Sequence, residues 1–161
     1  HSTVVNLDAY AICKPNVVHN LTELPLPFED VAFDYIIASH VFEHLPNWWA
    51  VFEDCVRILK HGGSMDIWLP GTASDGQLGY RDHLSYINGC SFYGVANIRE
   101  AVNAWCAMNR DSKAKEMQMV SYDKVLINQW WVKHAPKRIQ RWMAEHLRNV
   151  IGEEVIRFIR L

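Results

Sequence analysis

The stretch from residue 33 to residue 70 limits most strongly what this chain can fold into. Residues 35–39 form a short apolar run with β-branched and aromatic side chains, which is typical of a buried strand. Residues 46–60 are amphipathic with helical spacing, and residues 65–69 form a second apolar run. Strand, helix and strand in such close succession predict a right-handed βαβ crossover with two parallel strands.

The sequence also marks both ends of the predicted helix. Pro46 suits a first helical turn, where a missing N–H costs nothing, and Gly62 follows the amphipathic run as a stop signal. Arg57 and Lys60 lie in the last turn, where positive charge complements the helix dipole. The helix face that we expect to be buried comprises Trp48, Phe52, Cys55, Val56 and Leu59.

The remaining sequence continues the alternation of strands and helices. We expect strands at residues 3–7, 16–19, 116–128 and 153–161, and helices at 95–108 and 136–150. The length fits one domain by the usual size range, so residues 1–161 are expected to form a single α/β domain.

Three motifs follow one another in the central stretch: FDYII at residues 33–37, VFEHL at 41–45 and VRILKHGG at 56–63. Their order and spacing resemble consecutive motifs of class I S-adenosylmethionine-dependent methyltransferases, most closely the small type 11 group. The resemblance implies a Rossmann-like sheet, mostly parallel, that ends in two antiparallel strands. It also implies S-adenosylmethionine as cofactor and a small molecule as methyl acceptor.

The resemblance implies cofactor-binding residues at the ends of several strands. Asp8 matches the acidic residue that holds the cofactor ribose, although a surface aspartate that begins a turn fits its position equally well. Asn20 and Leu21 match the adenine side; the family commonly has an acid at Asn20, and an amide keeps its hydrogen bonding without the charge. Ser39 and His40 follow the strand at 35–39, on the rim where open α/β sheets bind ligands.

The long loop after residue 70 resembles the acceptor side of the family's pocket. It contains the pairs Asp82-His83 and Ser91-Phe92, and we expect Tyr80, Arg81 and Asp82 to bind substrate. Arg81 either holds an acidic group of the substrate or pairs with a neighbouring aspartate. His40 and His83 are the candidate general bases, because histidine accepts protons near neutral pH. The competing interpretations are a hydrogen-bonded turn residue for His40 and a solvated loop residue for His83.

The family's first strand, which ends in a G-x-G turn, has no match in this sequence. In the family this strand lies between the second and fourth strands, so without it two backbone edges would be exposed. We expect one of three outcomes: direct pairing of the second and fourth strands, a strand from another chain, or residues upstream of His1. The third is the one that we favour.

Composition narrows the functional classes. The net charge is −2 with both signs interspersed, which gives no electrostatic footprint for nucleic acid. No apolar run approaches the roughly 20 residues of a membrane span, so no membrane partner is expected. The four cysteines form no CxxC pair and are expected to be reduced thiols of a cytoplasmic protein.

Two alternatives to a methyltransferase stay open. One is a module that keeps the fold without catalysis and acts through its tryptophan-rich surface, as a homo-oligomer. The other is a zinc peptidase, because residues 40–44 fit H-x-x-E-H. That pattern requires both histidines on one helix, whereas here a buried strand leads into the pattern and Pro46 closely follows it. We therefore expect no bound metal.

Overall fold

The computed structural model describes residues 3–71, 74, 77, 79–92, 116–126, 134–146 and 151–161. The elements in chain order are β1 (Leu7–Asp8), η1 (Ala11–Cys13), β2 (Val17–Val18), β3 (Phe33–Ser39), η2 (Phe42–His44), α1 (Trp48–Ile58), β4 (Leu59–Pro70), η3 (Gly89–Phe92), β5 (Met117–Leu126), α5 (Lys137–His146) and β6 (Ile151–Arg160). The helix predicted at 95–108 lies outside the described residues.

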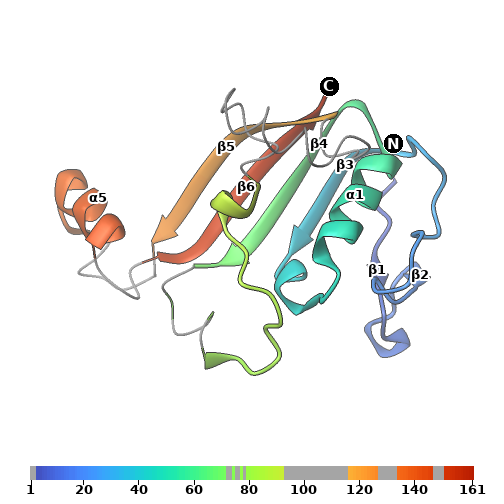
Figure 1. Ribbon diagram of the computed structural model, residues 1–161, viewed down its shortest axis with the longest axis horizontal. Helices are drawn as coiled ribbons and strands as arrows, with labels where there is room; N and C mark the ends of the chain where they lie inside the picture. Colours follow the sequence, from blue (N-terminus) through green and yellow to red (C-terminus); the bar gives the residue numbers. More distant parts are fainter. Residues whose placement is uncertain are drawn as a thin grey trace.

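Four strands form a mixed sheet in the order β3-β4-β6-β5 (Figure 1). β3 and β4 run parallel and are connected through α1, which confirms the predicted pair of parallel strands. β6 is antiparallel to both of its neighbours, β4 and β5. The predicted antiparallel strands at the C-terminal end are therefore confirmed.

The junction between α1 and β4 differs from the prediction. α1 ends at Ile58 and β4 begins at Leu59, so Gly62 lies inside a strand and its predicted role as a helix stop is wrong. The strands pair Phe33 with Leu59 and then Tyr35 with Ser64, so β4 carries extra residues between these two pairs. Gly62 has a φ of +78°, which an L side chain rarely adopts, and this allows the irregular stretch.

The core lies between α1 and one face of the sheet. Phe52 of α1 is fully buried, and its ring lies 5.3 Å from that of Phe158 on β6. Phe92, at the end of η3, is also fully buried and lies 5.2 Å from each of these two rings. Burial of one such side chain stabilises the fold by about 1.5–3 kcal/mol. The 79–92 segment is thus anchored to the core through Phe92.

The outer edge of β3 is not paired among the described residues. β3 pairs only with β4, whereas β1 pairs with β2 in a separate parallel sheet. Direct pairing of β1 with β3, the first of the three predicted outcomes, is therefore not formed. The side chains of Tyr35 and Ile37 on β3 are 49% and 59% exposed. The other two outcomes stay predictions.

None of the helices in the described ranges has both the length and the apolar character needed to cross a membrane.

Candidate functional site

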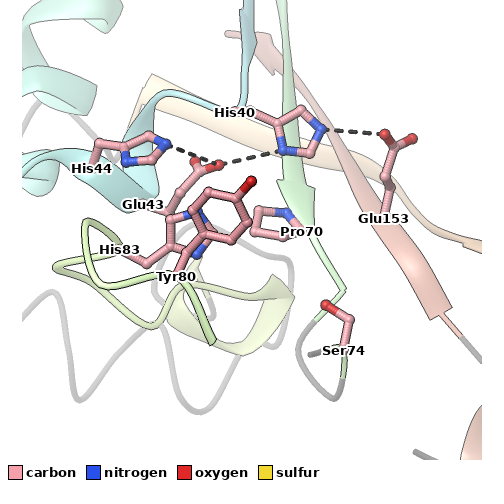
Figure 2. Close-up of a pocket in the computed structure, with 8 residues that line it drawn as sticks. All are labelled: His40, Glu43, His44, Pro70, Ser74, Tyr80, His83 and Glu153. Atoms are coloured by element: carbon pink, nitrogen blue, oxygen red, sulfur yellow. Dashed lines mark hydrogen bonds and ion pairs between the residues drawn. The ribbon is translucent and has the colours of Figure 1, made fainter. Parts of the chain in front are cut away.

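An open pocket of about 480 Å³ lies at the carboxyl ends of the parallel strands β3 and β4 (Figure 2). The 79–92 segment and the start of β6 complete its walls. Its lining residues are His40, Glu43, His44, Pro70, Ser74, Tyr80, His83 and Glu153. Carboxyl ends of parallel strands are where open α/β sheets bind ligands, so the position matches the predicted rim.

The turn that follows β3 positions the first two functional side chains. The N–H of His40 donates to the carbonyl of Trp68 at 2.9 Å, which extends the pairing with β4 by one residue. His40 itself has a φ of +53°, a left-handed conformation that is rare for a side chain with a Cβ atom. The chain then enters η2, which carries Glu43 and His44. Strained residues of this kind concentrate at functional sites.

Glu43 is a buried carboxylate at the back of the pocket. The residue is 0% exposed, and neither carboxylate oxygen has a hydrogen bond. The Nδ1 atom of His40 lies 3.4 Å from Oε1, and the Nε2 atom of His44 lies 4.0 Å from it. Figure 2 shows the carboxylate between these two rings. Burying a carboxylate that accepts no hydrogen bond is costly. A positive charge beside Glu43 would offset this cost.

Two histidines of the pocket are held by backbone carbonyls. Nδ1 of His44 lies 3.0 Å from the carbonyl oxygen of Asp82, and Nδ1 of His83 lies 3.3 Å from that of Gln77. A carbonyl oxygen only accepts, so in both rings Nδ1 carries the hydrogen and donates it. In the neutral ring, Nε2 then keeps its lone pair. The two rings pack edge to face at 4.8 Å, and Tyr80 stacks on His83 at 5.3 Å.

His40 lies between two carboxylates from distant parts of the chain. Its Nε2 atom is 3.2 Å from Oε1 of Glu153 on β6, and its Nδ1 atom faces Glu43 at the distance given above. The two contacts fix the orientation of the ring in the pocket. The ring is thereby held at the rim of the pocket with a carboxylate facing each of its nitrogens.

The structure brings together three of the residues predicted from the sequence: His40, Tyr80 and His83 all line the pocket. The side chains of Arg81 and Asp82 are 96% and 73% exposed and pair with each other at 3.4 Å, as in the alternative interpretation of Arg81. Asp82 contributes its backbone carbonyl to His44 instead. Their substrate-binding role stays a prediction.

The predicted cofactor residues other than His40 do not line this pocket. Asp8 and Asn20 lie at or just beyond the ends of β1 and β2, where Asp8 accepts a hydrogen bond from the N–H of Tyr10 and Asn20 from that of Thr22. Leu21 packs against the core, and Ser39 is the exposed last residue of β3. Their roles toward a cofactor also stay predictions.

Sequence reasoning missed Glu43, His44 and Glu153 as pocket residues. The first two lie in the VFEHL motif, which was used only to recognise the family, and in the H-x-x-E-H pattern, which was considered only as a peptidase motif. In the structure His40 precedes η2, a single 3₁₀ turn, so the two histidines do not share the α-helix that a zinc peptidase uses. Glu153 carried no local signal, because only the pairing of β6 with β4 brings it to His40.

Comparison with known proteins gives a family match over part of the sequence and similar folds among solved structures. The family model described as a methyltransferase domain matches residues 3–67, a stretch of less than half of the chain. This stretch contains the predicted residues at the ends of β1, β2 and β3. No curated protein matches the sequence with statistical significance.

Among solved structures, a SAM-dependent methyltransferase from Archaeoglobus fulgidus is similar with a TM-score of 0.56 and 13% identity, covering 96% of this chain and 74% of that one. A structure assigned as a methyltransferase from Bacillus halodurans gives 0.52 and 14%, covering 99% and 81%. A chain of the complex between the Haloferax volcanii Trm112 methyltransferase activator and a protein assigned as a methyltransferase gives 0.53 and 14%, covering 88% of this chain. The chain spans only 59% of that relative's length. Identities this low establish the fold alone.

Proposed function

We propose that this chain, which has the fold of S-adenosylmethionine-dependent methyltransferases, transfers a methyl group from that cofactor to a small-molecule acceptor. The observation that carries the proposal is the polar pocket at the carboxyl ends of β3 and β4. It begins within the stretch that matches the methyltransferase-domain family, at His40, Glu43 and His44. Support from the fold alone would be weaker, because one fold hosts many functions.

The residues present fit the cofactor. Asp8, Asn20 and Ser39 lie at or just beyond the carboxyl ends of β1, β2 and β3. Among the described residues, Oδ2 of Asp8 accepts no hydrogen bond, so this oxygen is available to the hydroxyl groups of a ribose. The amide of Asn20 offers both a donor and an acceptor to an adenine ring. When bound, the cofactor supplies an electrophilic methyl group on a positively charged sulfur.

The pocket supplies the groups that an acceptor needs. Methyl transfer is a direct displacement, so it depends chiefly on alignment of the acceptor atom with the methyl carbon. An acceptor O–H or N–H must also give up its proton. His40, oriented by Glu43 and Glu153, is the stronger candidate base; His83, held by Gln77 and Tyr80, is the second.

One observation favours a second candidate function. In the described part of the chain no strand pairs with the outer edge of β3, and this edge, beside the exposed residues Tyr35 and Ile37, offers a surface for another strand. A non-catalytic module with the same fold would use this edge for assembly and bind no cofactor. Oligomeric state alone does not separate the two functions, since enzymes also assemble.

Calorimetry with S-adenosylmethionine separates the two functions. It is carried out on the chain as given and, where the gene continues upstream of His1, on a form extended by that sequence. We expect the extended form to bind the cofactor and Asp8→Asn in that form to weaken binding at least tenfold. Asp34→Asn serves as the control, because the Asp34 side chain is 84% exposed and pairs with Lys60. Absence of binding by both forms would refute methyl transfer and leave the binding module.

A further inference from the structure

We propose that Glu43, His44 and His83 bind a divalent transition-metal ion of the zinc class. The three residues each offer one ligand atom, and these atoms all lie within 4.8 Å of one another. η2 supplies the first two ligands, and the 79–92 segment supplies the third, which lies beside them (Figure 2). The proposal departs from the expectation, drawn from the sequence, that the chain binds no metal.

The first argument is the carboxylate of Glu43. Both of its oxygens are buried without a hydrogen bond, although most buried polar groups in proteins have a partner. The nearest ring nitrogens, at 3.4 and 4.0 Å, offer an ion pair only if a histidine is protonated. A metal cation would satisfy the carboxylate while both rings stay neutral.

The second argument is the orientation of the two histidine ligands. Asp82 and Gln77 accept from Nδ1 of His44 and His83 through their backbone carbonyls, at 3.0 and 3.3 Å. Metal-binding histidines almost always donate their other ring N–H in this way, which fixes the tautomer and the ring. Nε2 is thereby left with its lone pair in both rings. The proposed proton transfer needs only one base. It therefore does not explain why both histidines beside Glu43 have Nδ1 bound to a backbone carbonyl.

The third argument is the set of donor atoms. Two imidazole nitrogens and one carboxylate oxygen are a ligand set found in catalytic zinc sites. Magnesium and calcium prefer oxygen ligands, so the two imidazoles argue against these ions. Ligand atoms about 2.1 Å from a tetrahedral ion lie roughly 3.4 Å apart, so binding would draw the three side chains closer together. His40 would then hydrogen-bond to the ligand Glu43 and tie it to Glu153.

Three protein ligands leave at least one coordination position open toward the pocket. A metal ion there polarises an oxygen that it binds and orients it. The acceptor would then be a molecule that presents a hydroxyl group to the ion. This consequence for the acceptor rests on the proposed function, whereas metal binding itself does not.

The test is titration of the whole chain, stripped of metal by a chelator, with Zn²⁺ in competition with a chromogenic indicator. Co²⁺ is then added to a separate sample to record its visible absorption. We expect one ion per chain and a Co²⁺ spectrum with nitrogen and oxygen ligands. His44→Ala, His83→Ala and Glu43→Gln should each lower Zn²⁺ affinity at least tenfold. The control is His61→Ala, an exposed histidine at the start of β4, which should leave the affinity unchanged.

Unfolding of the metal-free variants separates loss of a ligand from loss of the fold. Metal-free Glu43→Gln should be at least as stable as the metal-free parent, because the parent buries a carboxylate that accepts no hydrogen bond. Zn²⁺ should raise the midpoint of unfolding in the parent and not in this variant. Absence of Zn²⁺ and Co²⁺ binding would overturn the proposal, as would binding that His61→Ala weakens as much as the ligand variants do. Calorimetry with S-adenosylmethionine is independent of both results, so failure of the metal site is distinguishable from failure of the proposed function.

Discussion

The guanidinium of Arg157 holds the carboxylate of Asp66 with two hydrogen bonds, from Nε to Oδ1 at 2.7 Å and from Nη2 to Oδ2 at 2.6 Å. The two residues are directly paired across β6 and β4. The hydroxyl of Tyr35 on β3 donates to the same carboxylate at 2.9 Å. One carboxylate therefore connects three neighbouring strands.

Removal of this connection should destabilise the sheet. Asp66 is only 3% exposed, and Asp66→Ala leaves Arg157 and Tyr35 without their acceptor. We expect the free energy of unfolding to fall by about 1.5–3 kcal/mol, measured by urea denaturation. Asp34→Ala, which removes an exposed partner of Lys60, should cost less than about 1 kcal/mol. Equal losses in the two variants would contradict a special role for Asp66.

The same carboxylate predicts a dependence of stability on pH. The hydrogen bonds from Arg157 hold the pKa of Asp66 below its ordinary value of 3.8. The folded state therefore binds this proton less readily than the unfolded state does. Its stabilisation is complete above the unfolded pKa and is lost as the pH falls through the lowered folded pKa. Between about pH 5 and pH 3, the parent should lose more stability than Asp66→Asn in urea denaturation. Parallel losses in parent and variant would refute the assignment.

Arg57 gives a separate prediction for the loop before β3. Its guanidinium donates to Asp54 on α1 and to the carbonyls of Leu26 and Phe28 in the loop, at distances of 2.6–3.1 Å. A lysine keeps the charge but not the planar fork of donors. Arg57→Lys should lower the free energy of unfolding by about 1–3 kcal/mol. It should also speed amide exchange of residues 26–31, measured by mass spectrometry. Lys60→Arg, at a half-exposed ion pair, should change neither quantity.

The parts of the fold that the sequence predicted are those with a local physical signal. The crossover of β3, α1 and β4 follows from apolar spacing within each segment, and the C-terminal strands from alternation. Contacts in the structure account for the motif at 56–63. Arg57 donates to the loop before β3, and Lys60 pairs with Asp34. Gly62 and Gly63 form the irregular start of β4.

The parts that the sequence did not predict depend on tertiary contacts. The early end of α1 at Ile58 follows from the pairing of Leu59 with Phe33, which no local pattern encodes. His40 meets Glu153 only because antiparallel pairing sets the register of β6. Burial of Glu43 could not be inferred either, since an isolated glutamate is normally exposed.

The anchor of the pocket loop can be tested at Phe92. Its ring packs among Trp48, Phe52 and Phe158, and it is fully buried. Phe92→Ala should lower the free energy of unfolding by about 3–5 kcal/mol in urea denaturation, through lost contacts and a cavity. Limited proteolysis should also cut the 79–92 segment faster. Leu84→Ala, at a side chain that is 62% exposed, should leave both measurements close to those of the parent.

The last prediction concerns the close approach of the chain at Gly63. A Cβ atom there would lie 2.8 Å from the carbonyl oxygen of Lys60 and 3.0 Å from that of Asp34, and backbone atoms cannot move aside cheaply. Gly63→Ala should therefore shift the start of β4 away from β3 and lower the free energy of unfolding by about 1–3 kcal/mol. Gly79→Ala is the matched control, because a Cβ atom there meets nothing within 4 Å. Urea denaturation of both variants checks the contrast. A Gly63→Ala variant as stable as Gly79→Ala would mean that the backbones of β3 and β4 do not approach each other in this way.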